Sequence, residues 1–144
     1  MSLEQLYREV ILDHYRNPRH SEPLNNADSR SEGVNPMCGD EVAVAIELND
    51  DHITDVSVTG KGCSISQASG SMMAEAIVGL SKGEREELAE KFKGMLSSDV
   101  PLPDPPGSTL GDMESLAGVR EYPVRIKCAL LPWTTLAEAT NGRH

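Results

Sequence analysis

Two neighbouring segments of alternating apolar residues constrain the fold more than any other part of this chain. Residues 41–48 read EVAVAIEL, and residues 53–59 carry Val56 and Val58 in the same alternation. The polar stretch NDDH lies between them. Alternation of this kind around a polar turn predicts two antiparallel strands joined as a hairpin. The first strand then has one buried face, formed by Val42, Val44, Ile46 and Leu48.

Cysteines flank this predicted hairpin. The chain has three cysteines: Cys38 precedes the first strand, Cys63 follows the second, and Cys128 lies far along the chain. In an antiparallel pair the start of one strand lies beside the end of the next. We therefore expect Cys38, together with Asp40, to lie next to Cys63 at one end of the sheet.

The local sequence around each cysteine favours an ionised thiol. Cys38 lies in the loop NPMCGD, where Gly39 allows the backbone to bring the side chains of Cys38 and Asp40 to one point. Cys63 begins a helical pattern, so the positive end of a helix dipole should lower its pKa. Arg125 and Lys127 place two cations beside Cys128. We expect three thiolates that are exposed rather than buried.

Three thiolates and the carboxylate of Asp40 form a ligand set that suits zinc or a similar metal. No C-x-x-C motif occurs, so the ligands would have to converge from distant parts of the chain. Three alternatives remain open at this point. The cysteines could be reactive thiols without a metal, or small buried apolar residues. A disulfide is the third, although the number of cysteines is odd and no secretory signal is visible.

Helical periodicity and turn residues divide the rest of the chain. His14 and His20 lie near the end of the first predicted helix and are interpreted as helix-end or surface residues. Pro132 should kink or break the last helix near residues 129–131. Met72 and Met73 are predicted core residues, and so is Trp133. The predicted helices cover residues 2–16, 64–80, 84–96, 112–118 and 123–140, with loops at 22–33, whose end can pair as a short edge strand, and at 97–111.

These elements predict an α+β fold with a small antiparallel sheet of about three strands and helices packed on one face. The length fits a single domain over residues 1–144. The formal net charge of −10 makes nucleic acid an improbable partner. No apolar stretch approaches the length of a membrane span, and the first 15 residues are not a signal peptide. We therefore expect a cytoplasmic protein, monomeric or weakly oligomeric, whose thiols stay reduced.

Three segments resemble the NifU/IscU-like iron–sulfur cluster assembly family. They are NPMCGDE at residues 35–41, GKGCSISQAS at 60–69 and YPVRIKCALLPW at 122–133. The resemblance extends over nearly the whole chain and implies an IscU-like fold. It also implies that the site consists of Cys38, Asp40, Cys63 and Cys128.

Two features differ from the scaffold branch of that family and resemble its SufU-type branch. Lys127 stands where the scaffold branch has histidine, and an extra segment occupies about 97–112. By resemblance to SufU, the chain would bind Zn²⁺, take persulfide sulfur from a SufS-type cysteine desulfurase and pass it to downstream scaffold proteins. Whether that role makes it a sulfurtransferase enzyme stays open. The alternatives are a scaffold that holds a [2Fe–2S] cluster or iron on the same ligands, and a purely structural zinc domain.

Each residue of the site receives a specific expectation. Cys38 is the predicted persulfide acceptor, because its Pro/Gly loop can move at least cost. Asp40 is predicted to tune ligand exchange, since a carboxylate is the hardest and most labile donor of the four. Arg125 and Lys127 are predicted to offset part of the negative charge of the site, and Arg125 could also orient a carboxylate.

Overall fold

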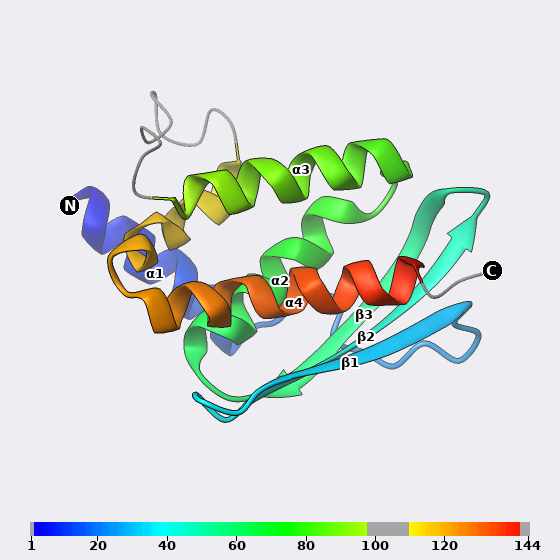
Figure 1. The fold of residues 1–144 in the computed structure, drawn as a ribbon, viewed down its shortest axis with the longest axis horizontal. Coiled ribbons are helices and arrows are strands. Elements are labelled where there is room, and N and C mark those ends of the chain that lie inside the picture. Colours follow the sequence, from blue (N-terminus) through cyan, green and yellow to red (C-terminus); the bar gives the residue numbers. More distant parts are fainter. Residues whose placement is uncertain (1, 98–109, 142–144) are drawn as a thin grey trace.

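The computed structural model describes residues 2–97 and 110–141. Four α-helices, one 3-10 helix (η1) and three strands make up these residues, which confirms the α+β class (Figure 1). Most of the predicted 97–112 loop lies outside the described residues, and the single-domain organisation stays a prediction. In chain order the elements are α1 Leu3–Arg16, β1 Ser29–Asn35, β2 Asp40–Asn49, β3 His52–Lys61, α2 Ser64–Ile77, α3 Lys82–Met95, η1 Gly111–Glu121 and α4 Pro123–Asn141.

The predicted hairpin forms the centre of an antiparallel sheet with strand order β1-β2-β3. Its turn is tight, because only Asp50 and Asp51 lie between the strands, and Asp50 adopts a positive φ of 57°. Val42, Val44 and Ile46 are all buried, as the alternation predicts. The predicted edge strand is also present as β1, which pairs with β2 along its whole length.

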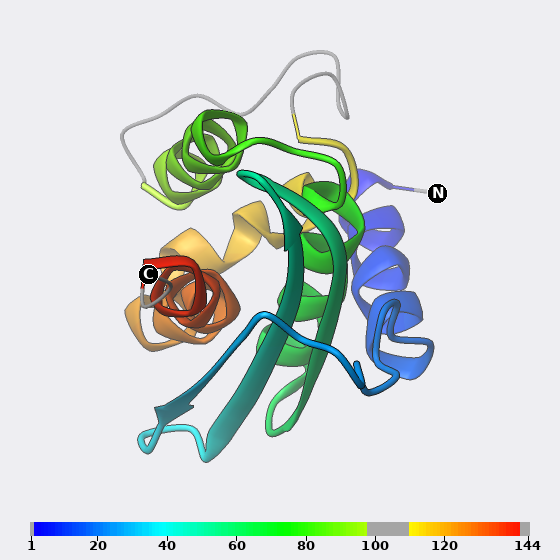
Figure 2. The same ribbon diagram turned by 90° about the vertical axis from the view of Figure 1, so that its right-hand side faces the viewer.

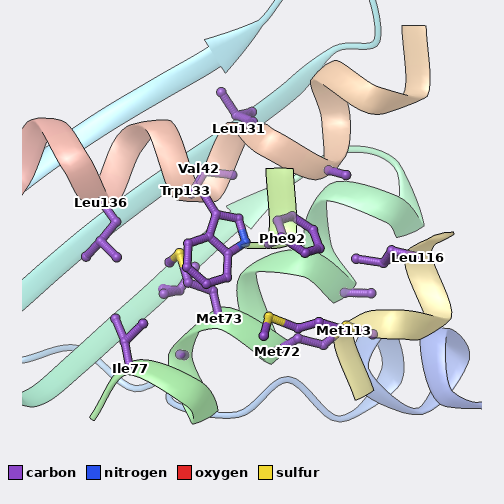
Figure 3. Close-up of a cluster of buried hydrophobic side chains, with 14 of the residues drawn as sticks. Val42, Met72, Met73, Ile77, Phe92, Met113, Leu116, Leu131, Trp133 and Leu136 are labelled. Atoms are coloured by element: carbon purple, nitrogen blue, oxygen red, sulfur yellow. The ribbon is translucent and has the colours of Figure 1, made fainter. Parts of the chain in front are cut away.

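Helices α2 and α4 cover one face of this sheet, and α1 packs against α2 (Figure 1). The core between helices and sheet is apolar (Figure 3). Phe92 of α3 stacks on Trp133 of α4 with ring centroids 5.3 Å apart, and Met72 and Met73 are buried beside them. The chain between α1 and β1 passes across the strands before it enters the sheet (Figure 2).

Capping residues begin two of the helices where local sequence favours it. Ser2 caps α1, and Ser81 caps α3 in a box with Glu84. Asn17 ends α1, one residue before Pro18. The end of α2 was predicted wrongly: the helix stops at Ile77, because the next residue is extended and Gly79 has a φ of +89°.

One prediction in the last third of the chain is wrong, and a second is wrong in part. The short helix predicted at 112–118 is a longer 3-10 helix, which continues through Gly118 to Glu121 and has no side-chain cap. Helix α4 is continuous through Pro132, so the predicted break is absent, whereas the kink stays a prediction. Pro132 lacks the N–H that would bond to the Cys128 carbonyl. The Ser69 hydroxyl of α2 donates to the neighbouring Ala129 carbonyl at 2.6 Å, which joins α2 to this part of α4.

His14 lies in the last turn of α1, as its interpretation as a helix-end residue predicts, but its side chain is completely buried, so a surface position is excluded. Its Nε2 lies 3.0 Å from the Asp112 carboxylate, and its Nδ1 lies 2.7 Å from the Ser71 hydroxyl. Asp112 therefore contacts His14 instead of capping η1. Since an ionised carboxylate only accepts, Nε2 carries the proton in the neutral ring and the Ser71 hydroxyl donates to Nδ1. This contact joins α1 to α2 and η1. His20 is exposed, as predicted.

Candidate metal centre

The three cysteines and Asp40 converge at the end of the sheet that is opposite the β2–β3 turn. Cys38 lies in the turn between β1 and β2, and Asp40 is the first residue of β2. Cys63 is the N-cap residue of α2, two residues after the end of β3, and Cys128 lies in the first half of α4. The pairing of Glu41 with Lys61 brings the first three together, as the hairpin geometry predicts.

Short distances join the four side chains. The Sγ atoms of Cys38 and Cys128 are 3.1 Å apart, and Cys63 Sγ lies 3.6 Å from Asp40 Oδ2. Ligand atoms of Cys38, Asp40 and Cys128 all lie within 4.8 Å of one another. Three sulfurs and one carboxylate oxygen are donors that suit Zn²⁺ or iron. The residues present therefore fit a thiophilic metal.

Asp40 has a structural role that its place in the sequence does not show. Its side chain is buried, and Oδ1 accepts a hydrogen bond from the Cys63 backbone N–H at 2.8 Å. Cys63 itself makes no side-chain cap for α2. Asp40 therefore supplies from β2 the acceptor and the negative charge that the first turn of α2 favours. Gly62 allows this approach, because a Cβ atom there would lie 2.7 Å from Asp40 Cα.

The expectation of three exposed thiolates is wrong for Cys128. This side chain is completely buried, whereas Cys38 and Cys63 are half-buried. Burial raises the pKa of the Cys128 thiol, and its hydrogen bonds with Asp40, Cys38 and Cys63 raise it further. Arg125 and Lys127 are both exposed, and a solvated cation cannot outweigh the loss of hydration around a buried sulfur. In the metal-free protein Cys128 is a neutral thiol, so metal binding would release its proton.

The structure leaves the roles of Arg125 and Lys127 as predictions. Both residues lie in the first turns of α4, close to Cys128 in the sequence. Within residues 2–97 and 110–141, neither side chain forms a hydrogen bond or ion pair with the four site residues. Their positions allow a long-range electrostatic effect, or contact with a bound partner.

Asn35 is a site residue that the sequence reasoning placed only in the loop. It is the last residue of β1, and its side chain is buried. Its Oδ1 accepts from the Met37 N–H at 3.3 Å, and its Nδ2 donates to Cys128 Sγ at 3.7 Å. An Asn side chain in a Pro/Gly turn commonly accepts a hydrogen bond from the N–H two residues further on, an arrangement called an Asx turn. This sequence signal could have identified the contact with Met37. Nothing local identifies the second contact.

Exposed apolar side chains lie near two of the site cysteines in the sequence. Val34 and Met37 flank the Cys38 turn, and they are 63% and 70% exposed. Tyr122 and Val124 precede Cys128, and they are 63% and 43% exposed. We call these four residues the apolar rim. Large apolar side chains that gather on a surface are typical of protein contact sites.

A second group of potential metal ligands consists of His14, Glu75 and Asp112. Both ring nitrogens of His14 already have partners, and Arg19 Nε lies 4.0 Å from the Glu75 carboxylate. A cation beside this carboxylate opposes metal binding there. This group therefore stabilises the contact of α1 with its neighbours.

The fold and the site together define a class of protein. It is a small α+β protein that gathers Cys38, Cys128 and the buried Asp40 within 4.8 Å of one another at one end of an antiparallel sheet, with Cys63 beside Asp40, in a set suited to a thiophilic metal. None of the described helices is long and apolar enough to cross a membrane.

The family model described as "NifU-like N terminal domain" matches residues 6–129, and the chain belongs to this family. This confirms the resemblance found in the sequence. The chain is 42% identical to the "Zinc-dependent sulfurtransferase SufU" of Bacillus subtilis, over 94% of this chain and 89% of that protein. It is 39% identical to the "Iron-sulfur cluster assembly scaffold protein IscU" of Streptococcus pyogenes, over 99% of this chain and 89% of that protein.

A solved structure confirms the IscU-like fold class. The crystal structure of FiSufU, described as a putative iron–sulfur cluster assembly scaffold protein for the SUF system of Fervidobacterium islandicum, superposes with a TM-score of 0.83 at 35% identity, and covers 96% of this chain and 99% of that chain. A relative named SufU and one named IscU each match more than nine-tenths of this chain in sequence.

Proposed function

We propose that this protein is a zinc-bound sulfur relay of iron–sulfur cluster assembly. It would accept persulfide sulfur from a SufS-type cysteine desulfurase and pass it to downstream scaffold proteins. A role in iron–sulfur cluster assembly follows from membership of the family. The observation that carries the finer proposal is the position of Cys38: it is half-buried in a Pro/Gly turn, with Cys128 Sγ at 3.1 Å and Asp40 beside it.

Cys38, Asp40, Cys63 and Cys128 are the residues that would hold the metal. Bound zinc would supply positive charge that keeps these thiols ionised at neutral pH without redox chemistry of its own. The side chains differ in how firmly the fold holds them. Cys63 begins α2 and Cys128 is enclosed in α4, whereas Cys38 lies in a turn whose backbone includes Gly39 with a φ of +70°. Cys38 is therefore the side chain best placed to meet a partner.

The transfer step is a thiol–persulfide exchange. The Cys38 thiolate attacks the outer sulfur of the partner's persulfide, a new S–S bond forms on Cys38, and the old S–S bond breaks. The partner cysteine leaves as a thiolate, and because one S–S bond replaces another the exchange needs no outside oxidant or reductant. Cys38 then carries the sulfur as a persulfide. In this role the chain acts as a sulfurtransferase-like partner of the desulfurase.

The surroundings of the site support docking of a partner protein. The apolar rim offers contact area around Cys38, and the exposed Arg125 and Lys127 lie along the same segment as its Tyr122 and Val124. These two cations would also offset part of the charge of three thiolates and one carboxylate. Both suggestions remain parts of the proposal.

A scaffold for a [2Fe–2S] cluster or iron is the second candidate function. The same donor set supports it, because thiolates are the usual cluster ligands. The relative from Streptococcus pyogenes carries the scaffold name. Lys127 favours the relay, since it stands where the scaffold branch has histidine.

Metal analysis and sulfur transfer test the proposal. Full-length protein purified without oxygen should contain one zinc per chain and no acid-labile sulfide. After incubation with a cysteine desulfurase and cysteine, mass spectrometry should locate one added sulfur on Cys38. The C38A variant should accept none. Iron with matching sulfide in the purified protein, or sulfur uptake by C38A at the native rate, would refute the relay.

A further inference from the structure

The side chain of Asn35 connects Cys128 Sγ to the turn that carries Cys38. Its backbone pairs with Asp40 across the turn, and its carbonyl accepts from the Cys38 N–H at 3.2 Å. Its side-chain amide reaches Met37 N–H on one side and Cys128 Sγ on the other. Asn35 and Cys128 are 93 positions apart in the sequence. One residue thus touches both the turn that carries Cys38 and the helix that carries Cys128.

The orientation of this amide follows from its partners. The Met37 backbone N–H can only donate, so the Asn35 oxygen must face it. The NH₂ group then faces Cys128 Sγ at 3.7 Å, a normal length for a hydrogen bond to sulfur. A sulfur atom that receives an N–H is stabilised as an anion, which is the form that binds metals. The site therefore uses an acceptor at one end of Asn35 and a donor at the other.

Both contacts depend on the polar atoms of Asn35 and not only on the volume of its side chain. An aspartate has the same shape and would keep the acceptor for Met37, but it would turn a second oxygen toward the sulfur. A serine is shorter and could keep an acceptor for Met37, but it has no group that reaches Cys128. An alanine would lose both contacts. The three substitutions thus separate the acceptor from the donor.

We propose that Asn35 is a positioning residue of the metal centre, which stabilises the Cys128 thiolate through its Nδ2 and fixes the Cys38 turn through its Oδ1. The inference rests on the proposed function only in placing a metal on these cysteines. Asn35 is not one of the four proposed ligands, but by this inference it contributes to the affinity of the site for metal. Hydrogen-bond partners of metal ligands commonly contribute about 10- to 100-fold in affinity.

The test compares N35S, N35D and N35A with the native full-length chain. Zn²⁺ affinity is measured by competition with a chelator, and thermal unfolding of the metal-free protein measures stability separately. Replacement of zinc by Co²⁺ gives a thiolate-to-cobalt charge-transfer band, which reports on the sulfur ligands directly. A residue that only maintains the fold would not change this band in a variant that remains folded.

We expect N35S to bind Zn²⁺ about tenfold more weakly than the native chain, with a shifted charge-transfer band and little change in metal-free stability. N35D should bind more weakly still, because its carboxylate faces a thiolate. Zinc affinity of N35S and N35D within twofold of native, with an unchanged cobalt band, would overturn the proposal. N35D keeps the side-chain shape, so the test holds even where N35S or N35A is unstable.

The sulfur relay and the role of Asn35 can fail separately. If native protein accepts no sulfur but N35S and N35D still lose zinc affinity, the relay is wrong and the role of Asn35 stands. If native protein accepts sulfur on Cys38 and the Asn35 variants bind zinc normally, the relay stands and the role of Asn35 is wrong.

Discussion

Gly62 provides the most direct test of how the fold positions the site. It separates β3 from Cys63, and its φ of +132° is a conformation that residues with a Cβ atom rarely adopt. A Cβ atom at this position would collide with the Asp40 carboxylate, and it would lie 2.7 Å from Asp40 Cα. Substitution G62A should therefore strain the backbone and push Asp40 away from Cys63.

The expected loss of stability has two parts. Backbone strain at a positive φ costs about 1–3 kcal/mol, and overpacking against Asp40 costs about 1–3 kcal/mol more. G79A separates the two, because Gly79 also has a positive φ of +89° but no atom lies within 4 Å of its Cβ position. We expect G79A to lose only the strain part, about 1–3 kcal/mol. G62A should lose about 2–6 kcal/mol in total.

Urea unfolding of the metal-free protein measures both variants, and chelator competition measures their Zn²⁺ affinity. Because Asp40 is a proposed ligand and also caps α2, G62A should lose at least tenfold in zinc affinity. G79A should bind zinc as the native chain does, since Gly79 lies outside the site. If G62A were no less stable than G79A and bound zinc normally, the close contact of Gly62 with Asp40 would have no energetic importance, and our account of the site would be wrong.

Three further predictions follow from other contacts. F92A removes a ring that is completely buried against Trp133 and should cost about 3–5 kcal/mol in urea unfolding; a loss below 1 kcal/mol would contradict this packing. Metal-free protein treated with a hydroperoxide should form a Cys38–Cys128 disulfide, because these sulfurs are 3.1 Å apart. Each disulfide gives two protons and two electrons to the peroxide. Peptide mapping that finds mainly disulfides of Cys63 would refute this prediction. The pKa of Asp13 lies below its ordinary value of 3.8, mainly because the Arg19 side chain donates a hydrogen bond to its carboxylate. This contact therefore stabilises the fold above pH 3.8 and is lost as pH falls through the lowered pKa; NMR titration of Asp13 should show a higher pKa in R19Q.

Local sequence signals predicted much of the fold correctly. The alternation of Val42, Val44 and Ile46 is a property of one strand, and it identifies the buried face without any other information. The caps at Ser2 and Ser81 depend on adjacent residues alone, but the cap at Ser81 was missed, since α3 begins at Lys82 and not at the predicted residue 84. The hairpin then places Cys38, Asp40 and Cys63 together, because the start of β2 lies beside the end of β3.

The predictions that failed concern contacts between distant segments. The cations near Cys128 suggested a lowered pKa, but the packing of α4 buries this sulfur and raises it. Pro132 suggested a kink or break, but helix α4 continues through it and is joined to α2 by the bond from the Ser69 hydroxyl to the Ala129 carbonyl. His14 is buried for the same kind of reason, since its partners Ser71 and Asp112 come from two other elements.

The sequence by itself determined the two central strands, the starts of α2 and α4 and the resemblance to the family, and it predicted the four residues that would bind a metal. Each of these depends on residue type and short spacing, which the sequence states directly. Only the tertiary structure decided which sulfur is buried, that Asp40 caps α2, and that Asn35 reaches Cys128. Burial and hydrogen bonding depend on what packs around a group, and here the neighbours of Cys128 come from residues far apart in the chain. The local dielectric and the available donors therefore follow from packing rather than from local sequence.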